Sequence, residues 1–236
     1  MESEQSFLRE AERFFAHLFP GVVGLWPSSL NRRLRKLRRF FLEPLRRAIV
    51  GELVGEPETL IVDPTLLSVL HPRQVKQSTG FDGAAWVRWG SFSTYGVKLY
   101  LLCASNVVPV CYELTPAKDV AGVRLMAELL AEAGLGEEVG RRLLGDLAYR
   151  SEASEDGLAQ RGILLITERA DQHGERQRIE ICFSSLKRVF GLGETLAKTL
   201  VGLATRIAAK MAAYTYGFYV NRFLGRPQGR IKELWA

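Results

Sequence analysis

Apolar and polar residues follow two different patterns along the chain, and the change between them divides the sequence. In residues 1–55 apolar positions recur every three or four residues, as on one face of a helix, with a break at the Pro-Gly pair of residues 20–21. Pro44 indicates either a second break or the first turn of a further helix. Past Gly55, short apolar runs typical of strands replace the helical pattern. We therefore expect a small helical N-terminal region, residues 1–57.

Strand and helix patterns alternate in the rest of the chain, which we expect to form one domain over residues 58–224. The order of three strands, helix, strand, helix, strand and helix predicts an α/β fold with a mixed five-stranded sheet flanked by helices. The predicted strands are residues 58–63, 96–103, 107–114, 142–149 and 162–168, and the predicted helices are residues 120–134, 151–162, 174–191 and 194–220. A short basic tail, residues 225–236, is expected to fray.

The composition is that of a soluble globular protein, with 47% hydrophobic and 25% charged residues. Three cysteines without a Cys-x-x-Cys pair and three histidines indicate neither a disulfide framework nor a zinc site. The N-terminus is acidic and polar, and charged residues interrupt the long apolar stretches, so we expect no signal peptide and no transmembrane helix. A reducing cytoplasm and the absence of a membrane partner fit these features best.

The net charge of +6 is concentrated in one segment. Residues 31–47 contain eight basic residues and one acid, which sums to +7, so the rest of the chain carries about −1. Apolar residues recur at helical spacing within this segment, and a basic amphipathic helix of this kind binds nucleic acid, anionic membranes or acidic partner helices. A solvated helix face is the alternative. The candidate contacts to a polyanion are Arg32, Arg35, Lys36 and Arg39.

Two aspartates interrupt apolar strand patterns, Asp63 in LIVDPT and Asp146 in LLGDLAY. An acid at the edge of a buried run costs free energy unless it is paired, caps a helix or faces a ligand. Each aspartate alone also has a structural interpretation, because Asp63 before a proline is typical of a turn and Asp146 is compatible with a strand end.

A third acid, Glu180, lies in the amphipathic helix predicted for residues 174–191. It belongs to a stripe along the flank of this helix, together with Arg176 and Lys187. Glu180 is either half of a surface salt bridge at i, i+4 or an acid at the edge of a site, and spacing alone favours the salt bridge. The apolar face of the helix is formed by Ile179, Cys182, Phe183, Leu186, Val189 and Phe190.

Asp63, Asp146 and Glu180 together place three carboxylates on two strands and a helix, each near the end of its element. Carboxylates brought close repel one another, and divalent cations remove that conflict. Oxygen ligands suit Mg²⁺ or Mn²⁺, and two such ions about 4 Å apart hold the attacking and leaving oxygens of a phosphoryl transfer. Because the basic segment matches a polyanion, the phosphodiester of a nucleic acid is the substrate we expect.

Residues 58–222 resemble the DDE transposases of bacterial insertion sequences, whose catalytic domain has an RNase H-like fold. The resemblance includes LIVDPT, the YGVKLYLL strand, LTPAKD, GDLAYRS and the closing helix. Its most specific part is a frame of Tyr, Arg, Glu and Lys with two, three and six residues between them. The 33 residues that separate Asp146 from Glu180 also match the family spacing. In this chain the frame holds His173, Arg176, Glu180 and Lys187.

The resemblance implies that the chain is a DNA transposase and that Asp63, Asp146 and Glu180 are its catalytic residues, which hold two Mg²⁺ or Mn²⁺ ions. Water or a DNA 3′-hydroxyl group is then the nucleophile, and Arg176 and Lys187 contact DNA. The implied partner is double-stranded DNA, as element ends and target, with a homo-oligomer assembled on it. The implied location is the bacterial cytoplasm, at the nucleoid.

The chain departs from the family pattern at two places, and two other functions stay open. His173 stands where tyrosine is usual, and Leu147-Ala148 follows the second aspartate where Lys-Gly is common, so the roles of these positions are undetermined. The N-terminal region is brief for a complete transposase. The alternatives are an RNase H-like nuclease that hydrolyses DNA without strand transfer, and a non-catalytic DNA-binding remnant or membrane-surface protein.

Overall fold

Helices and strands alternate in the structure much as the sequence predicts. The computed structural model describes residues 4–71, 73, 75, 81–89, 92–118, 123–134, 140–167, 173–194 and 197–234. The strands are β1 (Thr59–Ser68), β2 (Ala85–Trp89), β3 (Phe92–Ala104), β4 (Pro109–Thr115), β5 (Arg141–Leu144) and β6 (Ile163–Ile166). The helices are α1 (Glu4–Phe15), α2 (Pro27–Leu37), α3 (Glu43–Val54), α4 (Val123–Glu132), α5 (Glu152–Ala159), α6 (His173–Arg188) and α7 (Leu200–Phe223).

Six strands of the described chain form one mixed sheet, in the order β2-β3-β1-β5-β6 with β4 also paired to β3. β3 runs antiparallel to β1, β2 and β4, whereas β1, β5 and β6 are parallel to one another. The prediction of a mixed sheet flanked by helices is confirmed, but the predicted five strands omit β2. β2 is a short edge strand in which Trp86 is exposed and Arg88 interrupts the apolar residues, so it lacks the longer apolar run that marks a buried strand.

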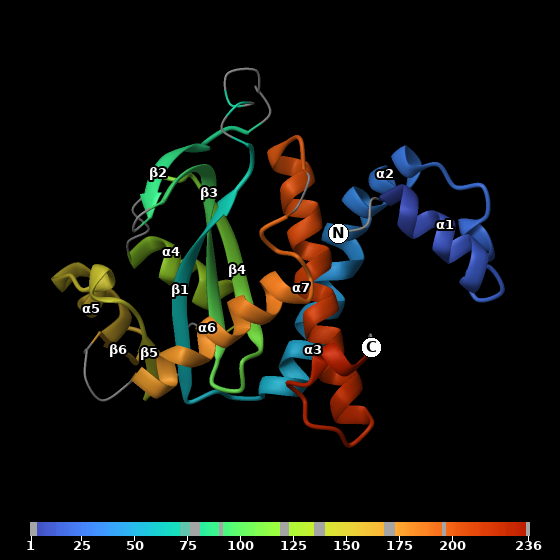
Figure 1. The fold of residues 1–236 in the computed structure, drawn as a ribbon. Helices are drawn as coiled ribbons and strands as arrows, with labels where there is room; N and C mark the ends of the chain where they lie inside the picture. The colour runs from blue at the N-terminus through green and yellow to red at the C-terminus, as the bar shows by residue number, and fades with distance from the viewer. Residues whose placement is uncertain are drawn as a thin grey trace.

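Helices cover the sheet from both sides. Figure 1 shows α6 crossing in front of the sheet, where it packs on β1, and α4 behind it, against β4. α7 packs against α3, α6 and β4 and buries Ile207, Met211 and Tyr214. The main core therefore lies between the sheet and the helices α6 and α7, while α1 and α2 extend away beside α7 (Figure 1).

The N-terminal region ends in a helical stretch in which α2 leads through a π-helix, η2 (Arg38–Leu42), into α3. Pro44 lies in the first turn of α3 and has no N–H to donate, and in a regular α-helix its ring would collide with a preceding carbonyl group. The wider π-turn, in which the Glu43 N–H bonds the Arg38 carbonyl group, accommodates this ring. The interpretation of Pro44 as the first turn of a further helix is confirmed. α3 buries its apolar side chains in the same core as the sheet, and the division of the chain at residue 57 stays a prediction.

The strand expected at residues 142–149 is wrong in its second half. β5 ends at Leu144, and Leu147–Tyr149 form a 3₁₀ turn, η4. The side chain of Asp146 explains the turn, because its Oδ1 atom accepts a hydrogen bond from the Leu147 N–H at 2.6 Å and caps the first turn. The second aspartate therefore lies just past the strand, at the start of a loop.

The C-terminal tail is packed where the structure describes it, so the expectation of fraying is wrong for residues 225–234. Ile231, in the short 3₁₀ helix η5 (Ile231–Leu234), is only 2% exposed because it belongs to the core. Within the described ranges, no helix combines the length and the apolar character needed to cross a membrane.

Candidate active site

Asp63 of β1 and Asp146, just past the end of β5, lie at the same level of two neighbouring parallel chain segments. β1 pairs with β5 so that Ile61 is opposite Leu144, and each aspartate follows its strand residue by two positions. Side chains two residues apart in an extended chain point to the same face, and Asp146 has extended backbone angles of φ −76° and ψ 160°. Since adjacent strands are about 4.8 Å apart, this register brings Asp63 beside Asp146.

Helix α6 brings the third acid to this place. Its apolar face is buried as predicted against the core, with Ile179, Cys182 and Leu186 almost fully enclosed. The flank of the helix is then turned toward β1, and the Lys187 Nζ donates a hydrogen bond to the Thr65 Oγ1 at 2.9 Å. Because Thr65 is two residues beyond Asp63, this bond ties the second half of α6 to the strand that carries the first aspartate.

The electrostatics of Asp63 show that the predicted site residues act on one carboxyl group. Burial is the largest effect, and it raises the Asp63 pKa to about 6, while the charge of Arg176 lowers the pKa. The carboxylates of Asp146 and Glu180 raise it further, and the ammonium group of Lys187 lowers it. Burial lowers the pKa of Lys187, and Asp63 opposes that shift. The fold therefore gathers three acids and two cations around Asp63, in the middle of β1.

The surface salt bridge, the alternative interpretation of Glu180, is not found. In the part of the chain that the structure describes, no ion pair joins Arg176 to Glu180. The charge of Arg176 acts on Asp63 instead, which lies on another element of the fold. Glu180 is therefore an exposed acid whose charge acts on Asp63.

The three carboxylates fit a divalent cation by their chemistry. They are hard oxygen donors, the ligand type that Mg²⁺ and Mn²⁺ select, and the Asp63 carboxylate is partly buried beside two like charges that a cation would neutralise. Among the described residues, no three side chains of the types His, Cys, Asp and Glu lie as close together as the ligands of one ion. The acids are thus gathered in one field, and binding would require their side chains to approach further.

A comparison with protein families identifies this arrangement. The model of the transposase DDE domain matches residues 55–216, which include all three acids. The chain belongs to the DDE transposase family. The predicted family membership is thereby confirmed, and the mixed sheet with its flanking helices is the RNase H-like fold that the resemblance implies; a bacterial source stays a prediction. Among curated proteins, none matches the chain at a significant level.

Solved structures similar to this transposase include an integrase catalytic core and transposases. The catalytic core of BIV integrase is 12% identical, with 72% of this chain and 97% of that chain covered and a TM-score of 0.42. The piggyBac transposase, in a synaptic complex with hairpin DNA, is 10% identical, with 88% of this chain and 58% of that chain covered and a TM-score of 0.48. The catalytic domain of Mos1 mariner transposase is 10% identical, with 76% and 90% covered and a TM-score of 0.33.

Sequence reasoning missed one residue on which the charges of the candidate acids act, Tyr149. Its side chain is buried, and its pKa is raised mainly by burial and further by Tyr100, Asp63 and Asp146. The signal in the sequence is its spacing, three residues after Asp146, which a single 3₁₀ turn converts into proximity. Reading residues 142–149 as a strand hid this relation.

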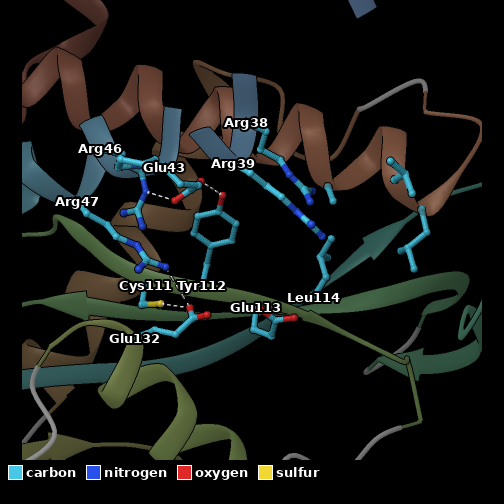
Figure 2. Close-up of a pocket in the computed structure, with 14 residues that line it drawn as sticks. Arg38, Arg39, Glu43, Arg46, Arg47, Cys111, Tyr112, Glu113, Leu114 and Glu132 are labelled. Carbon is cyan, nitrogen blue, oxygen red and sulfur yellow. Dashed lines mark hydrogen bonds and ion pairs between the residues drawn. The ribbon is translucent and has the colours of Figure 1, made fainter. Parts of the chain in front are cut away.

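The predicted DNA contacts of the basic segment separate into two places. Arg32, Arg35 and Lys36 line an open hollow of about 520 Å³ along α2. Arg39 lines a different cavity of about 640 Å³, where Figure 2 shows Arg38 and Arg39 extending toward β4. DNA contact by these four predicted side chains stays a prediction.

The cavity in Figure 2 also contains a set of paired charges. Arg46 donates hydrogen bonds to the carbonyl oxygens of Pro109 at 3.0 Å and Val110 at 3.1 Å, and to the Glu43 Oε2 at 3.0 Å. The Tyr112 hydroxyl donates to the other oxygen of Glu43, and the Arg46 guanidinium lies 5.3 Å from the centre of the Tyr112 ring. These contacts hold α3 against β4, which is a structural role for the basic segment.

Proposed function

We propose that this transposase domain cuts DNA at element ends and joins the ends to a target by attack of a DNA 3′-hydroxyl group on a phosphodiester. The observation that carries this proposal is the state of Asp63. It is partly buried in the field of Asp146 and Glu180, with Arg176 and Lys187 on the same side. A fold seldom keeps three like charges together unless a ligand of opposite charge binds there.

Asp63, Asp146 and Glu180 would hold two Mg²⁺ or Mn²⁺ ions in this proposal. When bound, such ions stabilise charge on the attacking and leaving oxygens of an in-line phosphoryl transfer. Asp63 lies within β1, and Asp146 lies two residues past the end of the neighbouring strand β5, where it caps a 3₁₀ turn. Glu180 approaches from α6, whose position is set by its buried apolar face. Arg176 and Lys187 lie along the same helix flank and would hold the DNA backbone against these acids.

Binding of the long DNA substrate requires a surface beyond the acids. Arg32, Arg35 and Lys36 lie along one helix, α2, and we propose that they contact phosphates of double-stranded DNA, with Arg39 of η2 as a separate contact at the neighbouring cavity. Two element ends must be held for strand transfer, so we propose a homo-oligomer assembled on DNA. A bacterial cytoplasm is the location that this function implies.

The test is a strand-transfer assay on DNA that carries the element ends. We expect joined products in Mg²⁺ or Mn²⁺ and none in chelator, and Asp146→Asn should remove cleavage and joining together while DNA binding persists. Glu175→Gln, which changes another acid of α6, is the matched control and should retain activity. Cleavage without joined products would instead indicate a nuclease, and full activity of Asp146→Asn would exclude the proposed site.

A further inference from the structure

Lys187 of α6 has a neutral hydrogen-bond partner although an acid lies nearby. Its Nζ atom donates to the Thr65 Oγ1 at 2.9 Å, and Thr65 is only 7% exposed. Among the described residues, no ion pair and no hydrogen bond joins Lys187 to Asp63. An ammonium group binds a carboxylate more strongly than a hydroxyl group, so the neutral partner requires an explanation.

Thr65 and Asp63 lie on the same face of β1. The strand pairs with β3 without a bulge over these positions, and residues two apart in such a strand have their side chains about 7 Å apart on one face. The bond to Thr65 therefore holds the Lys187 ammonium beside the Asp63 carboxylate without contact between them. The effects on the Asp63 pKa agree with this separation, because Lys187 has the smallest effect of the four charged side chains that act on it.

The stem of Lys187 is held by α6. The Nζ atom lies 5.9 Å from the centre of the Phe183 ring, one helical turn earlier, and Phe183 is itself 6% exposed. The ammonium group is thus fixed between a buried ring of α6 and a buried hydroxyl of β1. Lysine has a flexible four-carbon stem, so without the Thr65 bond its ammonium group can reach the carboxylate of Asp63.

We propose that Thr65 is a positioning residue whose hydroxyl holds the Lys187 ammonium away from Asp63, so that the carboxylate stays open to a divalent cation and the ammonium to a DNA phosphate. This inference rests on the proposed function of the acids. A direct ion pair between Lys187 and Asp63 would compete with the cation for the carboxylate oxygens. An ammonium group has three hydrogens to donate, so the bond to Thr65 leaves two for a phosphate.

The deciding experiment is calorimetric titration with Mn²⁺ of Thr65→Val, Thr65→Ser and the unmodified protein, each checked for folding by thermal melting in chelator. Valine has nearly the shape of threonine and lacks the acceptor, so Lys187 is released to pair with Asp63. We expect Mn²⁺ to bind about 10-fold more weakly to Thr65→Val, as after loss of other side chains that orient metal ligands. Thr65→Ser keeps the hydroxyl group and should bind Mn²⁺ normally.

A double variant separates this role from general damage to β1. In Thr65→Val/Lys187→Met no ammonium is left to compete, so the affinity for Mn²⁺ should return at least to that of the unmodified protein. Lys187→Met alone should also bind Mn²⁺ at least as tightly. Thr215→Val is the matched control: it removes the hydroxyl of another buried threonine, which donates to the Met211 carbonyl oxygen at 2.9 Å, and it should bind Mn²⁺ normally.

The outcomes separate this inference from the proposal on which it rests. If Asp63→Asn abolishes Mn²⁺ binding while Thr65→Val binds like the unmodified protein, the role of Thr65 is wrong and the acid site stands. The inference is also overturned if the double variant binds as weakly as Thr65→Val, or if Lys187→Met alone binds more weakly than the unmodified protein. Absence of Mn²⁺ binding by the unmodified protein would overturn both.

Discussion

Arg46 and Asp63 are two charged side chains withdrawn from water in one domain, and their surroundings are opposite. Arg46 is 2% exposed and makes hydrogen bonds to Glu43 and to two backbone carbonyl groups, so its charge is matched. Asp63 is partly buried, no hydrogen bond to its carboxylate exists among the described residues, and two further acids act on it. A matched buried charge holds elements of the fold together, whereas an unmatched one is a place for a ligand.

Charge balance therefore distinguishes the two regions better than shape does. The cavity beside Arg46 has a volume of about 640 Å³, yet Arg46 and Arg47 on its wall are paired with Glu43 and Glu132. The acids at the strand ends do not line this cavity. A hollow between η2 and β4 is thus a consequence of how the N-terminal helices attach to the sheet, whereas at the candidate site three acids outnumber two cations.

The largest effect is expected from the unmatched charge. Asp63→Asn keeps the shape of the side chain and removes one of three carboxylates, so strand transfer should fall about a thousandfold or more. Its melting temperature in chelator should stay the same or rise, because repulsion from Asp146 and Glu180 is relieved. Strand-transfer rates and thermal melts of the same preparation test both parts. If Asp63→Asn is active and melts at a lower temperature, Asp63 is a structural charge, and the distinction drawn between Asp63 and Arg46 is wrong.

The opposite result is expected for the matched charge. Arg46→Ala leaves the Glu43 Oε2 and two carbonyl groups without the Arg46 donor, and it should lower the free energy of unfolding by about 3 to 5 kcal/mol. For a chain of this length the melting temperature should fall by roughly 10 °C. Strand transfer per folded molecule should be unchanged. The amount of folded protein is measured before the assay, and the strand-transfer rate is divided by it.

Arg47→Ala is the matched control for this loss of stability. The Arg47 side chain is half exposed, and its ion pair with Glu132 is long, at 3.7 Å. Exposed pairs of this kind contribute about 0 to 1 kcal/mol. If Arg46→Ala and Arg47→Ala lower the stability equally, the hydrogen bonds of Arg46 are not what holds α3 against β4.

The acids were predictable because an acid within an apolar run is costly wherever it occurs. Asp63 and Asp146 stand out in any apolar pattern, and the period of residues 174–191 indicates which face of α6 is buried. What the pattern does not contain is the hydrogen bond from the Leu147 N–H to Asp146, which ends β5 and turns Tyr149 inward. A local side-chain contact of this kind leaves no trace in hydrophobic periodicity, so residues 142–149 look like one strand.

The basic segment shows a second limit of sequence reasoning. Its residues share one sign, so the sequence presents them as a single candidate surface. Their division depends on the π-helix before α3 and on the carbonyl groups of β4, which turn Arg46 inward and leave Arg32 on the open side of α2. Partners that lie more than 60 residues away decide this, as for Arg46 and Pro109, which are 63 residues apart.

The smallest effect is expected at Glu113, an acid at the cavity beside Arg46 on which two other acids act. It lies on β4 at the cavity, and its pKa is raised above the ordinary value of 4.5 by burial and by the acids Glu132 and Glu128 of α4, while Arg38 of η2 lowers it. The folded state binds the Glu113 proton more tightly than the unfolded state does. The stability that this proton contributes is therefore complete below the unfolded pKa of Glu113 and is lost as the pH rises through the folded pKa. Glu113→Gln removes that loss, so the variant should be more stable at neutral pH by roughly a few tenths of a kcal/mol, since the side chain is half exposed. The corresponding rise in melting temperature, about 1 °C, should disappear near pH 4, where both side chains are neutral.

Thermal melts at the two pH values measure this difference, with Glu155→Gln on the exposed side of α5 as the control. A lower melting temperature for Glu113→Gln at neutral pH would mean that attraction to Arg38 outweighs repulsion from α4, and that the charges of this cavity are matched without exception.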